Sequence, residues 1–80
     1  MAQEQHRTTA RILDIFEQVS ISEEGLTLTA LAQRLSAPKS SLFPIVHTME
    51  ERRYLIQDYG TGRYQIGPGA LILSTAARAH

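Results

Sequence analysis

Apolar residues recur along the first two thirds of the chain at the spacing of helices that bury one face. One such stripe, in a helix predicted over residues 8–19, contains Ile12, Leu13, Ile15, Phe16 and Val19. A second contains Leu28, Leu31, Ala32 and Leu35, and a third repeats at i, i+3, i+4 and i+7 through Leu42, Ile45, Val46 and Met49. The pattern therefore predicts three amphipathic helices, the last two joined by a turn over residues 36–39.

The last two helices and their turn, within residues 27–53, form a predicted helix-turn-helix, whose second helix can enter a DNA major groove. Thr27 precedes the first of these helices, and its hydroxyl is suited to accept a backbone N–H as an N-cap. We expect Leu26 to form a strand of one or two residues just before that cap.

The hydrophobic period changes from 3.6 to 2 after Arg53. Residues 55–59 and 63–66 are rich in β-forming residues and flank Gly60-Thr61-Gly62, whose two glycines suit positive φ in a three-residue loop. This predicts a β-hairpin, and a hairpin directly after a helix-turn-helix is a wing.

A further helix is predicted after the hairpin, where Pro68 suits a first helical turn. Residues 70–79 are good helix formers with more apolar surface than one small domain needs, so we expect the helix to lead to a second domain or a second subunit. The predicted fold is mostly α with a small β-hairpin. Residues 1–7 are a frayed N-terminus, 8–67 a winged helix-turn-helix DNA-binding domain, and 68–80 the start of a linker helix.

Composition adds bounds on the class of protein. Eighty residues suit one domain with a small core, and the lack of cysteine excludes disulfides and thiolate metal sites. No apolar run reaches the ~20 residues of a membrane span and no signal peptide opens the chain, so a cytoplasmic protein is expected. The net charge of zero counts against nucleic-acid binding. However, residues 36–80 hold five basic against three acidic side chains, so the half predicted to meet DNA is mildly basic.

The outward face of the second predicted helix supplies the candidate site. Opposite the apolar stripe lie Ser40, Pro44, His47 and Glu51, flanked by Ser41, Phe43 and Thr48. Short hydroxyls allow close approach to base edges, and an aromatic ring can touch a thymine methyl. We therefore predict that Ser40, Ser41, Phe43 and His47 face bases. The cations predicted to contact the DNA backbone are Lys39, Arg63, Arg34 and Arg53, with Arg63 near the tip of the wing.

Each of these residues can also be explained without a DNA contact. The helix face and His47 are equally consistent with a solvated surface, and Arg63 with a free loop-tip arginine. Three tyrosines near the hairpin suggest base stacking, although core or cross-strand packing explains them better. The three histidines are far apart and unsupported as metal ligands, and neither Ser40 nor Ser41 has a histidine placed to activate it. We predict no catalytic residue, no metal and no cofactor.

Three segments in the right order resemble the N-terminal winged helix-turn-helix domain of IclR-type transcriptional regulators over residues 8–79. They are Leu26-Thr27-Leu28 followed by Leu31-Ala32, then Pro38-Lys39-Ser40-Ser41, and then Gly62-Arg63-Tyr64-Gln65-Ile66-Gly67. The resemblance implies a regulator, either repressor or activator, that binds palindromic double-stranded operator DNA as a homodimer through its N-terminal and linker helices. It also implies a C-terminal domain, beyond this sequence, that binds a small-molecule effector.

The sequence departs from the family pattern at three positions. Pro44 stands where arginine is common, and inside a helix it costs ~3 kcal/mol unless Ser40 or Ser41 caps the helix. We therefore expect a kink or a loosened first turn between Lys39 and Ser41. Ala30 replaces a capping glutamate, and Ser36 replaces a turn glycine, which predicts a tight or strained turn. Pro44, the exposed Phe43 and the zero net charge leave open an alternative, a winged helix that binds protein rather than DNA.

Overall fold

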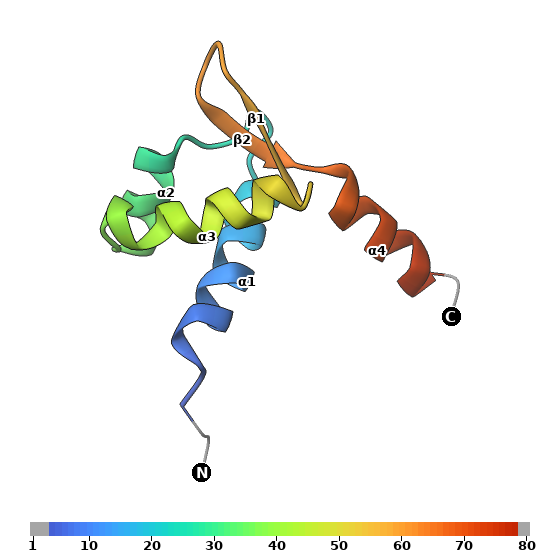
Figure 1. The fold of residues 1–80 in the computed structure, drawn as a ribbon, viewed down its shortest axis with the longest axis horizontal. Coiled ribbons are helices and arrows are strands. Elements are labelled where there is room, and N and C mark those ends of the chain that lie inside the picture. Colours follow the sequence, from blue (N-terminus) through green and yellow to red (C-terminus); the bar gives the residue numbers. More distant parts are fainter. Residues whose placement is uncertain (1–3, 79–80) are drawn as a thin grey trace.

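The computed structural model describes residues 4–78, which form four helices and one two-stranded sheet (Figure 1). The elements in chain order are α1 (Arg7–Ser20), α2 (Leu28–Leu35), α3 (Lys39–Glu51), β1 (Leu55–Asp58), β2 (Arg63–Ile66) and α4 (Pro68–Arg78). This order confirms the predicted fold class, a three-helix core with a hairpin wing and a following helix. No helix in the described part of the chain is both long and apolar enough to cross a membrane.

The core lies where the first three helices meet the base of the hairpin. Its most deeply buried side chains are Ile15, Leu31, Leu42, Val46 and Leu55. Leu13, which was predicted to belong to the buried stripe of α1, is instead 56% exposed. The prediction was wrong because Leu13 lies about 100° round the helix from Ile12, outside the arc that packs on the core.

The ends of α2 are fixed by local hydrogen bonds. Thr27 is the predicted N-cap, since its Oγ1 accepts a hydrogen bond from the amide of Ala30 at 3.1 Å. At the other end, Ser36 has left-handed backbone angles (φ 50°, ψ 46°), and the next amide, of Ala37, donates to the carbonyl of Ala32. This is a Schellman ending in which glycine is the usual residue, so the strain predicted at Ser36 is present.

The helix α3 is not capped by either of the two serines that would have placed Pro44 in its first turn. Pro38 is the N-cap, and neither Ser40 nor Ser41 caps the helix, so Pro44 lies in the helix interior. The Pro38 carbonyl accepts hydrogen bonds from the amides of Ser41 at 3.0 Å and Leu42 at 3.3 Å. A shared bond of this kind is common at helix termini, and the helix continues unbroken through Pro44 to Glu51, so the expected kink or loosened first turn is not seen.

The hairpin pairs its strands antiparallel, from Leu55 opposite Ile66 to Asp58 opposite Arg63. Its loop contains four residues, 59–62, rather than the predicted three, because the strand ends at Asp58, whose carboxylate accepts the amide of Gly60. Of the two loop glycines, Gly62 has positive φ and Gly60 does not, which corrects the prediction for Gly60. Leu26 forms the predicted short bridge, exchanging two backbone hydrogen bonds with Tyr64.

The chain passes from α3 into the hairpin through Arg53, which also has positive φ, at 68°. The carbonyl of Arg53 accepts a hydrogen bond from the amide of Gly69 at 2.8 Å, and a Cβ on Gly67 would collide with the same carbonyl. These contacts attach the first turn of α4 to the end of α3. Beyond them α4 extends away from the body (Figure 1), and none of its residues is buried.

Candidate nucleic-acid interface

The helix α3 presents its five predicted residues on an exposed surface. Lys39, Ser40, Ser41, Phe43 and His47 are all exposed, whereas Leu42, Val46 and Met49 on the opposite side are buried. The core therefore fixes the direction in which the exposed side chains point. Near its N-terminus this surface offers hydroxyls and one cation, which suit contact with base edges and phosphates.

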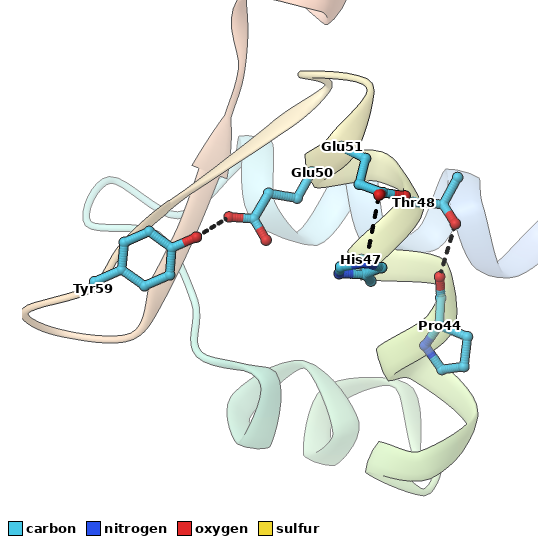
Figure 2. Close-up of polar contacts among 6 residues, drawn as sticks. All are labelled: Pro44, His47, Thr48, Glu50, Glu51 and Tyr59. Atoms are coloured by element: carbon cyan, nitrogen blue, oxygen red, sulfur yellow. Dashed lines mark hydrogen bonds and ion pairs between the residues drawn. The ribbon is translucent and has the colours of Figure 1, made fainter.

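Three of the exposed residues of α3 form a row along the helix. The rings of Phe43 and His47 are stacked, with centroids 5.7 Å apart and planes at 22°. One turn further on, Nε2 of His47 lies 3.7 Å from a carboxylate oxygen of Glu51 (Figure 2). The imidazole is thus held between an aromatic face and an acid, and its orientation is restricted before any ligand binds.

Lys39 is oriented by the preceding helix. Its Nζ donates to Oγ1 of Thr29 at 3.0 Å, and Thr29 lies in the first turn of α2. This bond joins the starts of α2 and α3. Because both groups are exposed, the ammonium retains donors for a further oxygen ligand.

Arg63 lies at the base of the loop rather than at its tip. It is the first residue of β2, is half-buried, and pairs across the sheet with Asp58. Arg63 lines a hollow of about 420 Å³, and Glu23 and Glu24, from the loop before α2, line it too. The expected position at the wing tip was therefore wrong, because the strand starts at Arg63 itself and four loop residues precede it.

The other two predicted backbone contacts, Arg34 and Arg53, are not gathered with the exposed residues of α3. Arg34 directs Nη1 to the side-chain oxygen of Gln18 in α1, at 3.3 Å. Arg53 is exposed, but its position is determined by the left-handed backbone that ends α3. Their DNA contacts remain predictions, as do those of the other candidate residues.

A bond between α3 and the wing had no counterpart in the sequence analysis. The Tyr59 hydroxyl donates to a carboxylate oxygen of Glu50 at 2.8 Å, which joins the wing loop to the last turn of α3 (Figure 2). This hydrogen bond, together with the charge of Glu50, raises the pKa of Tyr59 above its usual value of 10.0. Although 81% exposed, Tyr59 is thus a link between the two elements predicted to contact DNA.

The other two tyrosines pack as expected for core residues. Tyr64 is 4% exposed, and its pKa is raised by burial and then by the charge of Glu50. Tyr54 contacts Phe16 edge to face, with ring centroids 6.1 Å apart. Packing, rather than base stacking, therefore explains Tyr54 and Tyr64, whereas the prediction of packing was wrong for Tyr59.

A second contact missed from the sequence lies behind the helix-turn-helix. Nη1 of Arg11, in α1, donates to the carbonyl of Leu35 at the C-terminal end of α2, at 3.2 Å. A guanidinium at a helix C-terminus satisfies an orphan carbonyl and complements the helix dipole. The periodicity of α1 marked Arg11 only as outward-facing, and no local pattern indicates a partner 24 residues away.

The arrangement defines a winged helix-turn-helix DNA-binding domain, since a core-anchored second helix carries an exposed polar face beside a two-stranded wing. Within residues 4–78, no group of three or more acidic or histidine side chains is placed to hold a metal ion. A protein-family model described as the IclR helix-turn-helix domain matches residues 8–58. The chain therefore belongs to the IclR family of transcriptional regulators, a class of DNA-binding proteins rather than a class of enzymes.

Individual relatives agree with this assignment. The HTH-type transcriptional regulator BhcR of Paracoccus denitrificans (strain Pd 1222) is 36% identical over 64 residues, which is 80% of this chain and 23% of that protein. The IclR-type regulator of Alicyclobacillus acidocaldarius superposes with a TM-score of 0.83 at 25% identity, over 92% of this chain and 30% of its own. An IclR-family regulator of Brucella abortus gives a TM-score of 0.79 at 29% identity, over 91% and 28%. The chain thus spans less than a third of the length of these relatives.

Proposed function

We propose that this chain binds a specific double-stranded operator sequence, with α3 in the major groove and the hairpin against the adjacent backbone. The observation that carries the proposal is the exposed face of α3, where two serines, a stacked Phe43–His47 pair and a lysine occur on a helix whose other face is buried in the core. The recognition helix of a helix-turn-helix reads base edges with its N-terminal residues, where the lysine, the two serines and Phe43 lie, and His47 follows one turn after Phe43.

The roles follow from the chemistry of each group. Ser40 and Ser41 bring hydroxyls that both donate and accept, and Phe43 offers an apolar contact for a thymine methyl. His47 presents an imidazole edge to a base. Lys39 contacts a phosphate next to the bases and thereby fixes the register of the helix on the duplex.

The protein acts as a dimer on a palindromic site, with α1 and α4 supplying the contacts between copies. Leu71, Ile72 and Leu73 are each at least 57% exposed on α4, and a second copy would cover this apolar surface. The chain covers 23% of the length of BhcR, which leaves room in the full-length protein for a domain that binds a small-molecule effector. Repression of transcription in the cytoplasm is the expected outcome when such a dimer occupies a promoter.

A gel-shift experiment at low salt tests DNA binding directly. The probe is the DNA upstream of the protein's own gene, and the competitor is duplex DNA of scrambled sequence. A shift at or below micromolar protein that resists the competitor supports the proposal. If a confirmed dimer shifts neither DNA, the winged helix is instead a protein-binding module.

Replacement of Lys39 by alanine tests the phosphate contact. Loss of one such contact should weaken binding to every sequence and reduce the slope of log K against log salt by about one. Arg52→Ala, at the opposite end of α3, removes the same charge from an exposed arginine outside the predicted contacts and serves as the control. An unchanged slope for Lys39→Ala would remove Lys39 from the interface.

A further inference from the structure

A basic hollow of about 320 Å³ lies between the starts of α1 and α3. It is lined by Arg7, Thr8 and Arg11 from α1 and by Pro38 and Ser41 from the start of α3. Two guanidinium groups and two hydroxyls thus surround it, and no carboxylate lines it. Ser41 also belongs to the exposed face of α3, so the hollow adjoins the face predicted to read DNA.

The two arginines are one helical turn apart and remain able to bind a ligand. The side chain of Arg7 makes no hydrogen bond or ion pair within the described range 4–78, and the side chain of Arg11 uses only Nη1, on the carbonyl of Leu35. A guanidinium carries five N–H donors, so most of those on Arg11 are still available. The carboxylate of Asp14 lines an adjoining hollow with the same arginines but lies beyond ion-pair distance of either.

The cations at the starts of α1 and α3 lie where a positive charge lowers helix stability. Both α1 and α3 begin with a basic residue, Arg7 and Lys39, and neither has an acid in its first turn. The N-terminal end of a helix dipole is positive, so a cation there is unfavourable and an anion favourable. Charges at these positions therefore increase the positive potential at one corner of a chain whose net charge is zero.

We propose that this hollow binds a phosphodiester group of the DNA backbone, through a fork from Arg7 and Arg11 and the hydroxyl of Ser41. The inference rests on the proposed function and adds to it a DNA contact made by α1. Guanidinium groups match phosphate oxygens bidentately, and phosphate contacts of this kind orient a recognition helix on the duplex. A free inorganic phosphate has the same chemistry, and the experiment below separates the two sources.

The experiment is a salt titration of DNA binding by wild type, Arg7→Gln, Arg7→Lys and the control Arg52→Gln, an exposed arginine outside α1, α4 and the predicted contacts. Loss of one phosphate contact lowers the slope of log K against log salt by about one. We expect this for Arg7→Gln, a retained slope with weaker binding for Arg7→Lys because lysine lacks the fork, and no change for Arg52→Gln. Melting followed by circular dichroism checks that each variant is folded, and removal of a cation from the start of α1 should not lower the melting temperature.

Several outcomes would overturn the inference while the proposed function stands. One is wild-type DNA binding with the same slope in Arg7→Gln, and another is an equal fall in Arg52→Gln, which would indicate diffuse charge instead of a contact. The third concerns the DNA-free protein, in which inorganic phosphate would bind saturably, shift the NMR signals of the amides around Ser41, and fail to do so in Arg7→Gln. If Arg7→Gln nevertheless bound DNA with the wild-type salt slope, the hollow would be a site for free phosphate and not for DNA. No DNA binding by wild type at low salt would instead contradict the proposed function itself.

Discussion

On α3, the side chains of Leu42 and Met49 are no more than 6% exposed, whereas Phe43 and His47 on the other side are about half exposed. The inner residues are apolar and fill the core. The outer residues include a proline, which costs helix stability, and an aromatic pair and an acid, whose contacts along the helix contribute little. The difference indicates that the inner face determines where the helix lies, while the outer face is free to be selected for what it contacts.

The largest expected effect is on the inner face. Leu42→Ala leaves a cavity at a site with no exposure and should lower the free energy of unfolding by about 2–5 kcal/mol. Phe43→Ala, the neighbouring outer position, should change it by no more than about 0.5 kcal/mol. Urea unfolding followed by circular dichroism measures both free energies. An equal loss of unfolding free energy in the two variants would contradict the difference between the two faces.

Pro44 is the outer residue expected to matter most for stability, and its replacement should be favourable. Pro44→Ala restores an amide that can donate to the Ser40 carbonyl and removes a clash with it, so the free energy of unfolding should rise by about 1–3 kcal/mol. Thr48, whose hydroxyl donates to the Pro44 carbonyl, keeps that bond in the variant. A destabilised Pro44→Ala protein would mean that packing of the proline ring against α1 outweighs the lost helix bond.

His47→Ala should separate recognition from folding. We expect the free energy of unfolding to stay within about 0.5 kcal/mol, because the side chain is exposed. Affinity for the operator should fall by on the order of 1 kcal/mol, while affinity for scrambled duplex is unchanged. Fluorescence anisotropy with both DNAs is the measurement, and an equal loss on both would reassign His47 to the phosphate backbone.

The smallest expected effect concerns the link between α3 and the wing. The raised pKa of Tyr59 means that its bond to Glu50 stabilises the fold fully below the unfolded pKa of about 10 and is lost as pH rises through the folded pKa. Glu50→Gln should bring the pKa of Tyr59 back toward 10. Tyr64 is the internal control, since its pKa is raised chiefly by burial. Residue-resolved NMR titration of the tyrosine rings would show equal shifts in both if the bond were unimportant.

Local patterns in the sequence sufficed for the elements whose causes are local. The Thr27 cap and the stripe of α3 depend on residues within a few positions or on helix periodicity. For the same reason the exposure of the α3 face was predictable. The strained turn at Ser36 was expected from the family pattern, and the partner of the Leu26 bridge, Tyr64, is distant in the sequence.

The features that escaped prediction depend on contacts between distant segments. The bonds from Arg11 to Leu35 and from Tyr59 to Glu50 join different elements, and nothing in the spacing of either pair identifies its partner. Positive φ at Arg53 has no signal in the residue type, because arginine does not favour it. Two of the acids that line the hollow with Arg63, Glu23 and Glu24, come from a loop some forty residues earlier. The hollow therefore exists only in the folded chain.

The junction at Arg53 has a mechanical consequence. Its carbonyl holds the amide of Gly69, and Gly67 lies too close to the same group to accept a side chain. The first turn of α4 therefore cannot tilt without stretching a bond to the segment that ends the recognition helix. We therefore expect a displacement of α4 to be transmitted to the segment that follows α3, so that the two helices move together.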